Sequence, residues 1–163
     1  FPANTAEAIQ SLKAALFGET LEYTFPAHSL NRNGNMQGEI VGGNLSILYS
    51  NLGTKTILDT NKKILLLEDL DEYLYHIDRM MMAMKRAGKL QNLAGLVVGG
   101  LSDMKDNTIP FGKTAEEIIA EHVAEFDYPV CFNFPCGHIS DNRAVFMGKQ
   151  AKVEVGDHSI FVQ

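Results

Sequence analysis

A histidine on a glycine-flanked turn is the residue in this sequence most typical of catalysis. His138 follows a Cys-Gly step just beyond a short apolar segment, and the glycine permits backbone conformations that an idle surface loop seldom needs. Glu68 lies near the end of an earlier apolar segment, residues 62–69. A histidine base oriented by a carboxylate provides two members of a nucleophile triad. The sequence therefore predicts His138 as the base and Glu68 as its partner, although a lone carboxylate there more often is solvated or caps a helix.

The nucleophile of such a triad is missing. None of the seven serines lies in a Gly-x-Ser-x-Gly elbow, and Ser140 is too near His138 in sequence for easy geometry. Neither Cys131 nor Cys136 has an activating context, and Cys131 falls in a segment expected to be a buried strand. The third member must therefore lie on chain outside this sequence, or the triad hypothesis is wrong.

The composition is that of an ordinary globular protein of one domain. The chain has 163 residues, 45% of them hydrophobic, and a net charge of -6, which argues against a nucleic-acid or anionic-membrane surface. No apolar run approaches the roughly 20 residues that span a bilayer. The two cysteines fit no metal pattern. So small a number of cysteines in a chain of this length favours a reduced, cytoplasmic protein. The chain begins with Phe1 rather than methionine, so we expect a piece of a longer polypeptide.

The elements that must position these residues alternate between strands and helices. Apolar runs at 62–69, 93–100 and 128–132 are separated by amphipathic helical patterns at 73–87 and 114–126. This order is the signature of a parallel sheet with right-handed crossovers. Sites in such sheets form at the carboxyl ends of the strands, where Glu68, Gly99-Gly100 and His138 fall.

The flanking segments predict an added antiparallel layer. A capping-box spacing from Asn4 to Glu7 precedes a helix expected over 5–17, and extended segments follow over 19–41. A short helix is expected to begin near Asn44. Alternating patterns at 144–148 and 151–163 predict further strands, with a hairpin at Gly156-Asp157. The fold class expected for residues 1–163 is one α/β domain with a central parallel sheet and this added layer.

Four blocks of sequence resemble the serine LD-carboxypeptidases, also called muramoyltetrapeptide carboxypeptidases. The blocks are GGNLSILYSNLGT (42–54), ILLLED through YHIDRM (64–80), AGLVVGG (94–100) and PCGHISDN (135–142), and the resemblance covers roughly residues 38–150. Members of that family carry the serine nucleophile on an N-terminal domain, and a glutamate and a histidine on a C-terminal domain of swivelling β/β/α architecture. This chain resembles the C-terminal domain alone, which accounts for the missing nucleophile.

The resemblance implies a reaction and the residues that perform it. Glu68 would be the triad glutamate and His138 the triad histidine, with Glu72, one helical turn further on, as the competing carboxylate. The implied reaction is hydrolysis of the diaminopimelate–D-alanine bond of murein tetrapeptides in cell-wall recycling, without metal or cofactor. The implied partners are the N-terminal serine domain and a second copy in a homodimer. The sequence departs from many relatives at Glu72-Tyr73-Leu74-Tyr75 and after His138, which leaves the substrate detail open.

Other residues have weaker claims to a function. Arg143 is a candidate partner for the substrate carboxylates, and Asn44 is a helix N-cap first and a substrate-binding residue second. His122 is expected at the edge of the core, and the methionines of 80–84 in a core or subunit face. Two rival functions remain: a peptidase of the same family that confers immunity to peptide-nucleotide antibiotics, and a non-catalytic α/β binding module.

Overall fold

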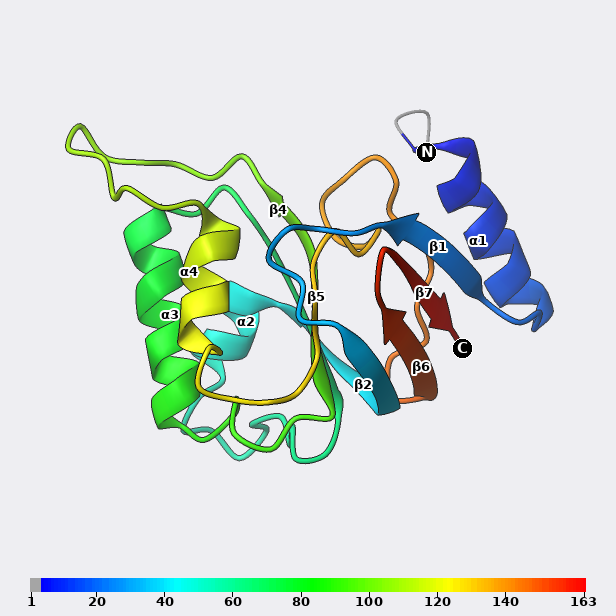
Figure 1. The fold of residues 1–163 in the computed structure, drawn as a ribbon, viewed down its shortest axis with the longest axis horizontal. Coiled ribbons are helices and arrows are strands. Elements are labelled where there is room, and N and C mark those ends of the chain that lie inside the picture. Colours follow the sequence, from blue (N-terminus) through cyan, green and yellow to red (C-terminus); the bar gives the residue numbers. More distant parts are fainter. Residues whose placement is uncertain (1–3) are drawn as a thin grey trace.

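The structure, a computed structural model, describes residues 4–163. Its centre is a seven-stranded sheet with strand order β1-β7-β6-β2-β3-β4-β5 (Figure 1). The strands are β1 (Glu22–Pro26), β2 (Gly34–Asn44), β3 (Ile64–Leu70), β4 (Gly95–Ser102), β5 (Val130–Cys131), β6 (Gln150–Val155) and β7 (His158–Val162). The helices are α1 (Ala6–Phe17), α2 (Leu45–Ser50), α3 (Leu74–Arg86) and α4 (Ala115–His122).

Strands β2 to β5 form the parallel half of the sheet. The first six residues of β3 are buried, as its continuous apolar run predicts for a strand covered on both faces. Alternate residues of β3 enter two cores. Leu65 and Leu67 pack with residues of α3 and α4, whereas Ile64 and Leu66 pack with residues of the antiparallel half. Helices α2, α3 and α4 lie together on one side of the sheet (Figure 1).

Strand β2 belongs to both halves of the sheet. Its first residues, Gly34 to Glu39, pair antiparallel with β6, and its last, Ile40 to Asn44, pair parallel with β3. The antiparallel half continues from β6 to β7 and then to β1. Figure 1 shows this half and α1 on the side of the molecule away from α3 and α4. The added antiparallel layer is thus joined to the parallel sheet through one continuous strand.

The structure confirms the predicted fold class and most of the elements. The central strands and helices lie where their patterns indicate, and Met80, Met81 and Met84 are buried in the core beneath α3. His122 is 8% exposed and contacts Asp78 across the α3–α4 interface, as expected for a histidine at the edge of the core. Within the described residues no helix is long and apolar enough to cross a membrane.

Several predicted boundaries are wrong. Residues 144–148 form no strand; the side chain of Gln163 pairs with the backbone of Phe146 in place of a neighbouring strand. Helix α4 ends at His122 rather than near 126, and the strand expected over 128–132 contains only two residues. The N-cap of α1 is Thr5 and not Asn4. Two of these differences lie where distant residues bond to the backbone: Arg32 donates to the carbonyl of Val123 just after α4, and Gln163 binds Phe146.

The apolar stripe of α1 also differs from that of an ordinary core helix. Leu16 and Phe17 are 74% and 77% exposed, and Ile9 and Leu12 are more than 40% exposed. The residues that α1 buries are the small Ala8 and Ser11, which lets the helix approach the chain beneath it closely. The helix is therefore held to the domain largely by its polar and small residues.

We expect this chain to fold without further segments, because both of its cores are closed by residues of the chain itself. Guanidinium unfolding followed by circular dichroism and by tyrosine fluorescence should give one cooperative transition with the same midpoint for both probes. A gradual loss of signal, or two midpoints, would contradict this expectation.

Candidate active site

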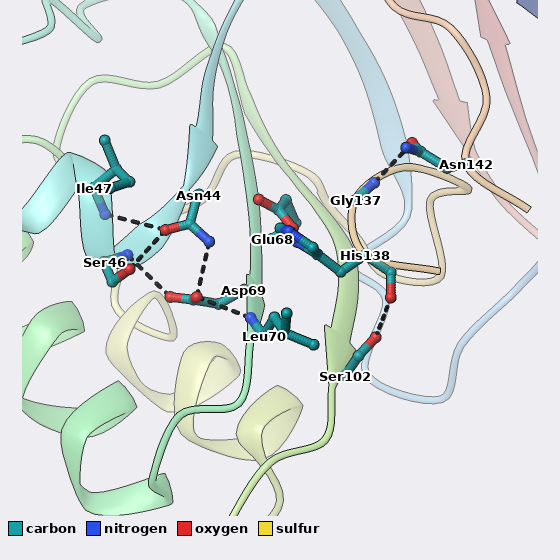
Figure 2. A network of polar contacts seen from close by, with 10 residues as sticks. All are labelled: Asn44, Ser46, Ile47, Glu68, Asp69, Leu70, Ser102, Gly137, His138 and Asn142. Carbon is teal, nitrogen blue, oxygen red and sulfur yellow. Dashed lines mark hydrogen bonds and ion pairs between the residues drawn. The ribbon is translucent and has the colours of Figure 1, made fainter. Parts of the chain in front are cut away.

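His138 and Glu68 form a direct pair at the carboxyl ends of the parallel strands. The imidazole Nδ1 lies 2.7 Å from the carboxylate oxygen Oε2 (Figure 2). The Glu68 side chain is 9% exposed and that of His138 is 51% exposed. Because an ionised carboxylate only accepts hydrogen bonds, Nδ1 carries the proton in this pair and Nε2 has a free lone pair. A half-exposed imidazole with that tautomer is suited to act as a general base.

Two glycines permit the close approach that the pair requires. Gly137 has φ of 104°, and a Cβ built on it would lie 2.8 Å from both Cβ and Oε2 of Glu68. A Cβ on Gly99 would lie 2.4 Å from the carbonyl oxygen of Cys136. The N–H of the next residue, Gly100, donates to this same oxygen at 2.9 Å. The glycine pair within β4 and the glycine before His138 thus allow the histidine loop to lie against β3.

Two consecutive carboxylates of β3 lie beside a bulge in the neighbouring strand β4. The pairing of β3 with β4 shifts register between Leu67 and Asp69, and Glu68 and Asp69 point in different directions (Figure 2). Asp69 is 1% exposed and accepts hydrogen bonds from the Asn44 side chain at 2.8 Å and from the Ser46 N–H at 2.9 Å. One carboxylate therefore serves the histidine while its neighbour anchors the start of α2. In the sequence Asp69 marks only the end of the apolar run at 62–69, and no pattern there predicts its bonds to α2.

The residues predicted to bind substrate already have protein partners. Asn44 caps α2: its side-chain oxygen accepts from the Ile47 N–H at 3.1 Å, and its amide donates to Asp69. The Arg143 guanidinium donates to both oxygens of Asp141, at 3.0 and 2.9 Å, and lies over the Tyr23 ring. The structure brings Asn44 beside β3 at the level of Glu68. The substrate-binding roles of Asn44 and Arg143 remain predictions.

The competing carboxylate has a different histidine. Glu72, two residues before α3, contacts His76 in the first turn of that helix at 2.6 Å. The hydrogen-bond partner of His138 is Glu68. This geometry favours Glu68 over Glu72 as the carboxylate that orients His138.

No nucleophile contacts the imidazole within residues 4–163. Ser102 donates its hydroxyl hydrogen to the backbone carbonyl of His138 at 2.8 Å and not to the ring. Burial raises the pKa of the Cys136 thiol to about 11, and the negative charge of Glu68 acts in the same direction. Burial likewise raises the pKa of Cys131 to about 11. Both thiols are protonated at neutral pH, so neither supplies a thiolate. The same residues contain no group of three or more histidine, cysteine or acidic side chains that could hold a metal ion.

A family model described as the LD-carboxypeptidase C-terminal domain matches residues 37–153, well over half of the chain. The chain belongs to this family. A Bacillus subtilis protein named "Probable murein peptide carboxypeptidase" is 34% identical over 134 residues, covering 80% of this chain and 41% of the relative. The family resemblance drawn from the four sequence blocks is therefore confirmed.

Two solved structures of other proteins have a similar fold. The structure of muramoyltetrapeptide carboxypeptidase from Oxalobacter formigenes has a TM-score of 0.86 and 23% identity, covering 97% of this chain and 54% of that chain. The self-immunity protein MccF, in complex with glutamyl sulfamoyl guanosine, has a TM-score of 0.72 and 19% identity, covering 82% and 39%. This chain thus spans about two fifths of the Bacillus relative and about half of the Oxalobacter structure.

We expect Gly137→Ala to destabilise the LD-carboxypeptidase domain more than Gly112→Ala does. Both glycines have positive φ, but a Cβ on Gly112 meets nothing within 4 Å. Gly112→Ala should therefore lower the free energy of unfolding by about 1 kcal/mol from backbone strain alone. Gly137→Ala should cost about 2 kcal/mol more because it also displaces Glu68. Equal losses in guanidinium unfolding would mean that the loop and β3 are not in contact.

Proposed function

We propose that this chain supplies the histidine and glutamate of a serine LD-carboxypeptidase, which removes the terminal D-alanine of murein tetrapeptides during cell-wall recycling. The observation that carries the proposal is the His138–Glu68 pair, fixed at 2.7 Å, in a family of LD-carboxypeptidase C-terminal domains. The absence of a nucleophile at this pair among the described residues is consistent with a serine on a separate N-terminal domain.

Each residue has a defined step in the proposed reaction. Nε2 of His138 takes the serine proton as the serine oxygen attacks the carbonyl carbon of the diaminopimelate–D-alanine amide. The imidazolium then gives that proton to the leaving D-alanine amine, and an acyl-enzyme ester remains. Water, deprotonated by the same nitrogen, hydrolyses the ester and restores the serine. Glu68 holds the Nδ1–H tautomer throughout and stabilises the imidazolium.

The exposure of the pair suits a site completed by a second domain. Glu68 is shielded while half of the His138 side chain is open, so a serine-bearing domain can approach Nε2 without disturbing the pair. Donors for the oxyanion would come mostly from that domain. We further propose that the complete enzyme is a cytoplasmic homodimer that acts without metal or cofactor.

A second candidate function has one specific observation in its favour. The fold is also similar to that of MccF, whose solved complex contains glutamyl sulfamoyl guanosine. A self-immunity peptidase that cleaves a peptide-nucleotide would use the same His138 and Glu68. Assaying the complete enzyme with murein tetrapeptide and with an aminoacyl nucleotide amide separates the two, since kcat/KM should be higher for the true substrate class. A non-catalytic binding module would cleave neither.

The proposed function predicts that His138 and Glu68 act as a unit. In the complete enzyme, His138→Ala and Glu68→Ala should each lower kcat for tetrapeptide at least about 100-fold with little change in KM, because both act mainly in the transition state. The double variant should be little worse than the worse single one. Multiplying losses, measured by D-alanine release, would show that the two residues act independently.

Glu72→Ala is the matched control, since Glu72 also pairs with a histidine but not with His138. It should remain within about tenfold of the parent. Collapse of activity in Glu72→Ala, with Glu68→Ala still active, would transfer the carboxylate role to Glu72.

The chain of 163 residues by itself should release no D-alanine. Release of D-alanine that His138→Ala abolishes would mean that the site is complete without a second domain.

A further inference from the structure

The N-terminus of α1 is bonded to the loop that carries His138. The Thr5 N–H donates to the carbonyl of Ser140 at 3.0 Å, and the Thr5 hydroxyl donates to Oδ1 of Asp141 at 2.9 Å. The same hydroxyl oxygen accepts the N–H of Ala8 at 3.1 Å as the N-cap of α1. One hydroxyl thus starts the helix and holds the loop, so forming α1 and placing the loop are coupled.

A second set of contacts holds the end of the same loop. The Arg143 guanidinium binds Asp141 through two nitrogens and lies over the Tyr23 ring, 5.5 Å from its centroid. Ala144 donates its N–H to the Ser11 hydroxyl at 2.9 Å and accepts from the Tyr23 hydroxyl at 2.8 Å. The Arg143 guanidinium holds the pKa of the Asp141 carboxyl below its ordinary value, and the Thr5 hydroxyl acts in the same direction. Asp141 is therefore ionised at neutral pH, beside a helix N-terminus that favours negative charge.

Hydrogen bonds between residues of the loop hold it together, so a displacement at Asp141 also moves His138. The Arg143 N–H donates to the carbonyl of Pro135 at 2.8 Å, and the Gly137 N–H donates to the Asn142 side chain at 3.0 Å. On the other side, β4 holds the carbonyl of His138 through Ser102. Among residues 4–163 the imidazole has one hydrogen-bond partner, Glu68, and the His138 side chain is 51% exposed. Its orientation therefore depends on where the loop backbone lies.

We propose that Asp141, bound by Thr5 at the start of α1, is a positioning residue that sets the alignment of His138 with Glu68. The inference rests on the proposed function for its effect on catalysis, although its effect on the imidazole is independent of any reaction. The pair formed by Thr5 and Asp141 joins residues far apart in sequence, and the contact with α1 restrains the loop on the side opposite to β4. Without it, the middle of the loop loses its side-chain anchor on α1 although the contacts of Ala144 and of β4 remain, and His138 samples orientations in which Nδ1 no longer donates to Glu68.

The first test measures the His138 tautomer in the chain of 163 residues. Long-range 1H–15N correlation spectra, recorded at about pH 8.5 where free histidine is neutral, report the fraction of imidazole protonated on Nδ1. Free imidazole side chains favour the Nε2–H tautomer, whereas the Glu68 hydrogen bond selects Nδ1–H. Thr5→Val and Asp141→Ala should both shift His138 toward the Nε2–H tautomer, and Thr5→Ser, which keeps the hydroxyl, should retain the parental spectrum.

Thr114→Val is the matched control. Thr114 caps α4, on the other side of the sheet, with its side-chain oxygen just as Thr5 caps α1. The Thr114→Val substitution therefore removes the same kind of N-cap and leaves the loop that carries His138 unchanged. If Thr114→Val changes the His138 tautomer as much as Thr5→Val does, the effect is a general loss of stability and the positioning role is wrong.

The second test measures kinetics in the complete enzyme. Thr5→Val and Asp141→Ala should each lower kcat about tenfold with KM within about twofold, because misalignment of the base affects the reaction and not substrate binding. The double variant should resemble the worse single one, since each change removes the same Thr5–Asp141 hydrogen bond. If either folded variant keeps the parental tautomer and kcat, Asp141 does not position His138. If the parental enzyme cleaves no tetrapeptide, the proposed function fails, and the tautomer alone decides the positioning role.

Discussion

The hydrogen bond between His138 and Glu68 is the contact on which the rest of the site depends. It requires a loop backbone to lie against the end of a buried strand, closer than a side chain on that loop would allow. Gly137 and Gly99 make this approach possible because neither has a Cβ. The carboxylate is shielded by the same packing, so its negative charge is directed at one imidazole nitrogen and not dispersed into water. The absence of a Cβ at these two glycines therefore allows the contact that fixes the tautomer of His138.

The end of strand β3 buries charged side chains, which need polar partners there. Its end carries two adjacent carboxylates, Glu68 and Asp69, both less than 10% exposed. Buried carboxylates are costly unless they are paired or hydrogen-bonded. Successive side chains of a strand point to opposite faces, so Glu68 meets a histidine and Asp69 meets the N-terminus of α2, and each has its own partners. The second carboxylate thereby fixes the position of Asn44 and of the β2–α2 junction beside the site.

The antiparallel half has a part in the site as well as in the core. Strand β1 carries Tyr23, and α1 precedes it with Thr5 and Ser11; together these residues hold the loop between His138 and Ala144. Because small and polar side chains make the contact, the large apolar residues of α1 remain on the outside of the helix. The histidine is thus held between β4 of the parallel half and α1 of the antiparallel half.

The sequence by itself determined the central architecture and the histidine of the pair. The continuous apolar runs of β3 and β4 are typical of strands buried on both faces, and the order of strands and helices favours a parallel arrangement, so Glu68 and the His138 loop were expected at one sheet edge. Only the tertiary structure decided which carboxylate reaches the imidazole, since the choice between Glu68 and Glu72 depends on the path of the loop that carries His138. It also gave Asp69 its bonds to α2 and Thr5 its bond to Asp141. The pairing of residues 5 and 141 involves chain separated by 136 positions, and no local pattern reports contacts at that distance.

The same reason explains why residues 144–148 form no strand although their sequence alternates like one. A strand requires a neighbouring strand with free backbone groups, and here the side chain of Gln163 occupies the position of that neighbour.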